Sequence, residues 1–198
     1  VYENNAPVYL RSHPLTVERL SDMQNRAQGA PYRQVVDSLD FHLARAKLRA
    51  QMGTPQEGVN EFGKQLREKK YVSEAATRYG LSYSLLRAKD VMAAQREFEA
   101  LNALKVSSPM FAGLAASIRI AAGDLPAATA IYRDALQRYP QSTSLIYGYA
   151  EALLAGRQYD QALLFLDSQL QLHPVDFRLY GLQARTFAAT GRRLQQHR

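Results

Sequence analysis

The sequence repeats with an internal period of 34 residues, and this period limits the folds that the chain can adopt. One series of alanines with this spacing runs through Ala94, Ala128 and Ala162. A second series runs through Ser82, Ala116, Ala150 and Ala184, and a third joins Pro140 to Pro174. Alanine is common in the chain, so the agreement between the series carries more weight than any one of them. Periods of about 20 to 50 residues are typical of proteins that stack one small structural unit on the next.

The residues inside one period indicate the kind of unit. From Thr16 onward apolar residues recur near the helical period of about 3.6, and turn signals separate segments of roughly 12 to 20 residues. The unit 109–142 has small residues, a turn, an aromatic residue and a final proline where the tetratricopeptide pattern has them: Ala116, Gly123, Ala128, Tyr132, Ala135 and Pro140. We therefore predict an all-α fold, a tetratricopeptide-repeat superhelix of stacked antiparallel helical hairpins.

The period also sets the limits of the repeats. Regular repeats are predicted at Ala75–Ser108, Pro109–Ser142 and Thr143–Asp176, followed by a capping helix at Phe177–Thr190. An earlier hairpin, Phe41–Gln65, fits only with an insertion of about two residues before the regular repeats, and we interpret it as a degenerate leading repeat. Ahead of it, an extended arm is expected at Val1–Pro14, and a helix from Thr16 to near Gly29.

A motif at the start of the chain resembles a known family. Residues 12–22 read Ser-His-Pro-Leu-Thr-Val-Glu-Arg-Leu-Ser-Asp, similar to the Ser/Thr-His-Pro segment that closes the protease domain of HExxH zinc metallopeptidases. Followed by helical repeats, it resembles the bacterial β-barrel assembly-enhancing proteases, in which a periplasmic protease domain precedes a tetratricopeptide domain. The resemblance implies that residues 1–30 are the arm and linker helix from the end of a protease domain, and that 31–198 form the tetratricopeptide-repeat domain of a longer periplasmic enzyme.

Catalytic groups are missing from the chain itself. No HExxH is present, because the four histidines are followed by Pro14, Leu43, Pro174 and Arg198. There is no cysteine, no Gly-x-Ser-x-Gly and no phosphate-binding loop. We expect no enzymatic activity, no metal site and no cofactor in this chain, while the resemblance implies a zinc metalloendopeptidase as the parent. His13 could reach that zinc only together with the parent protease domain.

The net charge and the distribution of apolar residues argue against some classes of partner. The net charge is +7, but the basic residues are scattered and tryptophan is absent, which argues against nucleic acid. No run of about 18 apolar residues is present, so no membrane-spanning segment is expected. The lack of cysteine fits either a reducing or an oxidising compartment, so a periplasmic location is what the resemblance implies.

Binding is expected on the inner face of the superhelix, which the first helix of each repeat lines. Tyrosine offers apolar contact with a polar tip, and arginine can grip a carboxylate with two hydrogen bonds. The predicted ligand contacts are Tyr79, Tyr83, Tyr147, Arg178 and Arg185. The competing interpretation is that tyrosines at this spacing pack repeats together.

Two functions follow from these predictions. The first is a protein-interaction scaffold that recruits substrate proteins or peptides to the attached metallopeptidase, with outer-membrane proteins and their assembly machinery as the partners that the resemblance implies. The alternative is an intramolecular regulatory domain, which packs on the parent protease domain and controls access to its cleft.

Overall fold

The computed structural model describes residues 16–29 and 36–191, and the chain divides into two compact units, Val1–Asp37 and Ser38–Arg198. In the first unit the described secondary structure is one helix, α1 (Thr16–Gly29), with the limits expected from the sequence. The predicted arm Val1–Pro14, and His13 with it, lie outside the described residues. The division into 1–30 and 31–198 stays a prediction.

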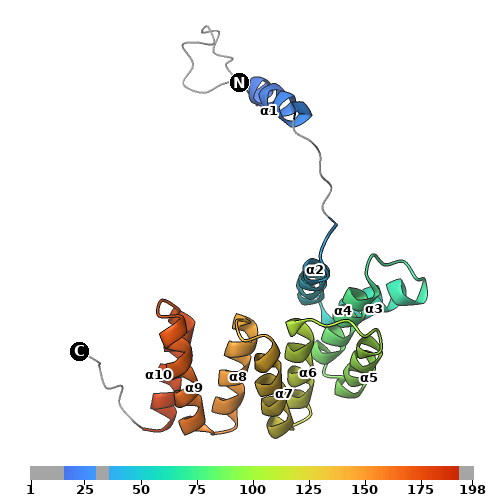
Figure 1. The fold of residues 1–198 in the computed structure, drawn as a ribbon. Coiled ribbons are helices and arrows are strands. Elements are labelled where there is room, and N and C mark those ends of the chain that lie inside the picture. The colour runs from blue at the N-terminus through green and yellow to red at the C-terminus, as the bar shows by residue number, and fades with distance from the viewer. Residues whose placement is uncertain (1–15, 30–35, 192–198) are drawn as a thin grey trace, which may run out of the picture. The chain divides into compact units, whose positions relative to one another are not determined.

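The second unit is built from antiparallel helical hairpins, and all secondary structure described in it is helical (Figure 1). The helices are α2 (Leu39–Gln51), α3 (Pro55–Arg67), α4 (Glu74–Arg87), α5 (Val91–Asn102), α6 (Pro109–Ala121), α7 (Leu125–Arg138), α8 (Thr143–Ala155), α9 (Tyr159–Leu172) and α10 (Phe177–Ala189). The pairs α4/α5, α6/α7 and α8/α9 coincide with the three predicted regular repeats, and α10 closes the stack on α8 and α9. The predicted all-α tetratricopeptide fold is confirmed.

Local sequence explains where the helices start and stop. Thr54 and Glu57 form a capping box at the start of α3, and the carboxylate of Asp124 accepts a hydrogen bond from the backbone N–H of Ala127 at the start of α7. Helices α7 and α9 stop two residues before Pro140 and Pro174, as expected for a residue that disfavours helix before it. These signals fix the length of each repeat.

Small residues let the two helices of a hairpin approach closely. Ala94, Ala128 and Ala162 are completely buried, as expected of small residues at a close crossing of two helices. In the first regular repeat the partner position is Ser82, also fully buried, whose hydroxyl donates a 2.8 Å hydrogen bond to the carbonyl of Ala94. A serine therefore replaces alanine here without leaving a buried polar group unpaired.

Between hairpins, two glycines make room for rings. A methyl group added at Gly80 in α4 would lie 2.5 Å from the Phe62 ring of α3, and one added at Gly148 in α8 would lie 2.6 Å from the Tyr132 ring of α7. Phe62 and Tyr132 are 3% and 6% exposed. Each ring thus fills the gap to the next hairpin by lying against bare backbone.

The leading hairpin departs from the regular geometry. Helices α2 and α3 both pack extensively on α4 but touch each other little, whereas the two helices of each later hairpin are in close contact. This agrees with the prediction of a degenerate repeat, and it leaves an opening between α2 and α3.

Candidate functional site

The first helices of the hairpins form a continuous row. Helix α2 contacts α4, α4 contacts α6, α6 contacts α8, and α8 contacts α10. We call the side of these five helices that carries the predicted ligand contacts Tyr83, Tyr147, Arg178 and Arg185 the A-helix face. In tetratricopeptide superhelices this row lines the concave side, where extended ligands bind.

At one end of this face Tyr79 and Tyr83 lie together. Their rings stack with centroids 6.3 Å apart, and the Tyr79 ring lies 6.2 Å from that of Phe111. Tyr79 is only 2% exposed, and burial raises the pKa of its hydroxyl. Most of its surface is therefore used for packing between repeats, the competing role considered from the sequence.

Tyr83 is more accessible and has polar neighbours on α2. Its hydroxyl accepts a 3.0 Å hydrogen bond from the side-chain amide of Gln51, and the Lys47 ammonium lies 5.9 Å from its ring centroid. The sequence did not point to Lys47 or Gln51, because the two-residue shift of the leading hairpin hides their register. Extending that shift back through α2 assigns Lys47 to the repeat position that Tyr83 occupies in the next repeat, which is a position on the inner face.

A small cavity of about 130 Å³ opens between these helices. Its walls come from α2, α4, α6, α7 and α8: Lys47, Tyr79, Tyr83, Pro109, Met110, Gly113, Leu114, Ser117, Tyr132 and Ser144. Aromatic rings, a cation and several hydroxyl groups thus line one cavity. An apolar side chain of a bound peptide with a polar neighbour would find matching groups there.

At the other end Tyr147 and Arg178 are brought together. The Tyr147 hydroxyl donates a 2.6 Å hydrogen bond to Asp176, and the Arg178 guanidinium carbon lies 4.3 Å from the Tyr147 ring centroid. Arg178 also pairs with Glu151 across 3.2 Å. The hydrogen bond from Tyr147 holds the pKa of the Asp176 carboxyl below its usual range and raises that of the tyrosine.

Asp176 and Arg185 complete this end of the face. Asp176 was not predicted; it caps α10 by accepting hydrogen bonds from the backbone N–H groups of Arg178 and Leu179. Arg185 is exposed and has no ion pair within residues 36–191. The structure therefore gathers the five predicted contacts into two pairs and one free cation, and ligand binding by them stays a prediction.

The Tyr147–Asp176 contact predicts a pH dependence. Since the folded-state pKa of Asp176 is depressed, its contribution to stability is complete above the unfolded pKa of about 3.9 and is lost as the pH falls through the lower folded value. Tyr147→Phe should raise the Asp176 pKa, as seen by carboxyl NMR titration, and make the thermal midpoint less sensitive to pH between about 5 and 2. A Tyr180→Phe control should leave this titration unchanged.

Within residues 16–29 and 36–191, no group of three or more His, Asp or Glu side chains is placed to hold a metal ion. No helix of this part of the chain has both the length and the apolar character needed to cross a bilayer.

Comparison with known proteins agrees with the fold. A tetratricopeptide repeat family model matches residues 119–186. The structure of YrrB, described as a tetratricopeptide protein with an unusual peptide-binding site, superposes with a TM-score of 0.53 at 12% identity, covering 88% of this chain and 84% of YrrB. At that identity the likeness establishes the fold alone.

One relative by sequence matches nearly the whole chain. The beta-barrel assembly-enhancing protease of Yersinia pestis is 26% identical over 196 residues, which is 98% of this chain but 40% of the relative's length. This agrees with the resemblance inferred from residues 12–22. The second unit of the chain has the tetratricopeptide-repeat fold, and the chain is similar in sequence to a part of that protease.

Proposed function

We propose that this chain is a protein-interaction scaffold whose A-helix face holds an extended segment of another polypeptide. The observation that carries the proposal is the pairing of an aromatic ring with a cation at both ends of the face, Tyr83 with Lys47 and Tyr147 with Arg178. Such pairs offer apolar surface to a side chain and positive charge to a carboxylate. Arg185 adds an unpaired cation beyond them.

The similarity to the Yersinia protease suggests what the scaffold serves. Since the chain spans 40% of that relative, we propose that it belongs to a longer periplasmic zinc metallopeptidase whose catalytic groups lie in another part of the protein. The scaffold would recruit substrates, or outer-membrane proteins and their assembly machinery, to that enzyme. Zinc would be bound by the protease domain.

A second role is favoured by the surface of α2. Phe41, Leu48 and Met52 are 50%, 62% and 71% exposed, and their spacing places them along one side of the helix. Large apolar side chains in a row are typical of a surface that another domain covers. We propose, as the alternative function, that this side of α2 packs on the parent protease domain and regulates access to its cleft.

Capture from a bacterial envelope extract would test the first role. The full chain is immobilised and compared with a Tyr83→Ala/Arg185→Gln variant, which removes one ring and one cation from the A-helix face. The matched control is Met92→Ala/Arg96→Gln on α5, which removes an exposed apolar side chain and a cation elsewhere. We expect the wild type and the control to retain envelope proteins that the Tyr83→Ala/Arg185→Gln variant does not retain.

Two results would contradict the scaffold proposal. Equal capture by all three proteins would place binding outside the A-helix face. Absence of any specific partner, combined with cross-linking of Leu48 to the protease domain in the full-length parent, would favour the regulatory role.

A further inference from the structure

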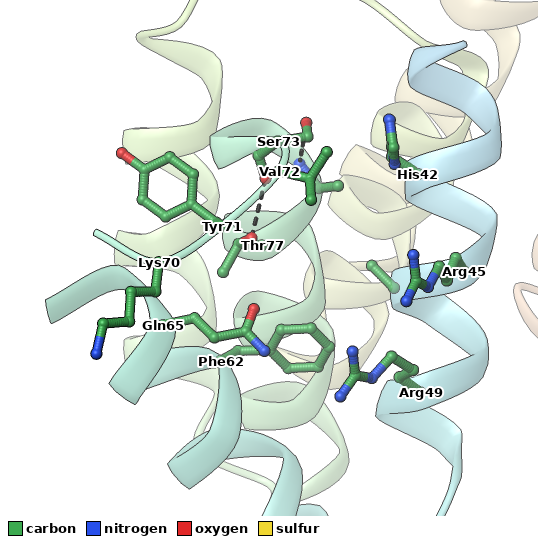
Figure 2. Close-up of a pocket in the computed structure, with 12 residues that line it drawn as sticks. His42, Arg45, Arg49, Phe62, Gln65, Lys70, Tyr71, Val72, Ser73 and Thr77 are labelled. Carbon is green, nitrogen blue, oxygen red and sulfur yellow. Dashed lines mark hydrogen bonds between the residues drawn. The ribbon is translucent and has the colours of Figure 1, made fainter. Parts of the chain in front are cut away.

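A second hollow lies in the opening between the helices of the leading hairpin. It is a cleft of about 420 Å³ formed by α2, the end of α3, the loop 70–73 and the first turn of α4 (Figure 2). Its floor is apolar: Phe62 is 3% exposed, with Ala46 and Ala76 beside it, while Val72 at the mouth is 84% exposed. The Tyr83 and Tyr147 rings of the A-helix face do not line it.

Among the described residues, the ionisable side chains that line this cleft include basic groups but no carboxylate. The basic groups belong to His42, Arg45, Arg49 and Lys70. Arg49 pairs with Glu61, and Lys70 lies 3.1 Å from Glu68, so two of the cations have partners behind the lining. Arg45 is exposed without an ion pair in the described part of the chain. The mouth therefore keeps an excess of positive charge.

The uncharged polar groups of the lining already have partners inside the protein. The Ser73 hydroxyl caps α4, and the Thr77 hydroxyl donates a 2.9 Å hydrogen bond to the Ser73 carbonyl. The Gln65 amide donates to Glu61, and the Tyr71 hydroxyl to Glu74. What remains unmatched is the apolar floor and the guanidinium of Arg45, while the side chain of Lys70 is 77% exposed and its ammonium can bind a second carboxylate beside Glu68. This combination calls for an apolar side chain accompanied by carboxylates.

The cations stand on two opposite rims. In Figure 2, Arg45 and Arg49 project from α2 on one side of the Phe62 ring, and Lys70 lies on the other side. A single chain-terminal carboxylate would satisfy one rim only. An extended segment with an acidic side chain two residues before and two residues after an apolar one presents all three to the same side, because side chains alternate along a strand.

We propose that this cleft binds an acidic internal segment of a partner polypeptide, in extended form, with an apolar side chain on Phe62 and Val72 and carboxylates facing Arg45 and Lys70. The site would be separate from the A-helix face and would give the chain a second point of attachment to its partner. A partner that engages both sites gains affinity because the second contact is intramolecular.

The probe is a fluorescent pentapeptide, Glu-Gly-Leu-Gly-Glu, labelled and with its C-terminus amidated, whose binding to the full chain is followed by anisotropy. Its Gln-Gly-Leu-Gly-Gln analogue is expected to bind at least about fivefold more weakly, the effect of losing two exposed ion pairs. Arg45→Gln/Lys70→Gln should weaken binding of the acidic peptide by a similar factor. Added salt should do the same.

Two control variants test whether the loss of peptide binding is specific to the cleft. Arg96→Gln/Arg119→Gln removes two exposed cations elsewhere, and Tyr83→Ala/Arg185→Gln alters the A-helix face; both should bind the acidic peptide as the wild type does. The far-ultraviolet circular dichroism and thermal midpoint of each variant establish that it is folded. Undetectable binding at millimolar protein, equal affinity for the glutamine peptide, or an equal loss in the Arg96/Arg119 variant would each overturn the proposal.

Discussion

Replacing Tyr79 by alanine is expected to lower the free energy of unfolding by about 3–5 kcal/mol, the cost of removing a large aromatic side chain from a packed core. Tyr79 is 2% exposed and belongs to the largest buried cluster of the described chain, between Tyr83 and Phe111. Chemical denaturation followed by circular dichroism measures the loss.

Tyr83→Ala provides the contrast, since both tyrosines were predicted as ligand contacts. Tyr83 is partly exposed, so its removal should cost about 1 kcal/mol while weakening ligand capture. Similar stability losses in the two variants would show that Tyr83 is a packing residue like Tyr79. The pair thus separates a structural tyrosine from a candidate binding tyrosine one helical turn away.

The second large effect is expected at Gly80. An alanine there would place its methyl group 2.5 to 2.9 Å from three carbons of the Phe62 ring, which is 3% exposed. Overpacking of this kind costs about 1–3 kcal/mol. Gly80→Ala should therefore lower the free energy of unfolding, although alanine is the better helix former.

Gly113 is the matched control, because it also lies inside a first helix of a repeat. Nothing lies within 4 Å of a methyl group added there, so Gly113→Ala should raise the free energy of unfolding by about 0.5–1 kcal/mol. Urea melts of the two variants should shift in opposite directions. A stabilising Gly80→Ala would mean that the Phe62 ring has room to move.

The sequence predicted the repeat architecture well because short-range signals encode it. The buried series Ala94, Ala128 and Ala162 and the prolines after α7 and α9 mark packing positions and helix ends, which depend on residue type at fixed spacing. Each helix of the three regular repeats accordingly lies where the period placed it.

The site was less predictable because it depends on what surrounds each side chain. Tyr79 and Tyr83 have the same residue type and both project from α4, yet Phe111 from the next repeat helps to cover only one of them. The cleft beside Phe62 was not predicted at all, since it results from the loose contact between α2 and α3. No local pattern reports how far two helices separate.

Gly80 and Gly148, which lie against the rings of Phe62 and Tyr132, restrict the order in which the repeats can follow one another. Equivalent positions along the stack carry Tyr79-Gly80, Gly113-Leu114, Tyr147-Gly148 and Gly181-Leu182. The second residue of each pair therefore alternates between glycine and leucine from one repeat to the next. If the first two regular repeats were exchanged, the Phe62 ring would face Leu114 instead of a glycine. The units share a fold but are not interchangeable, and side-chain volume therefore keeps the chemical groups of the binding surface in a fixed linear sequence.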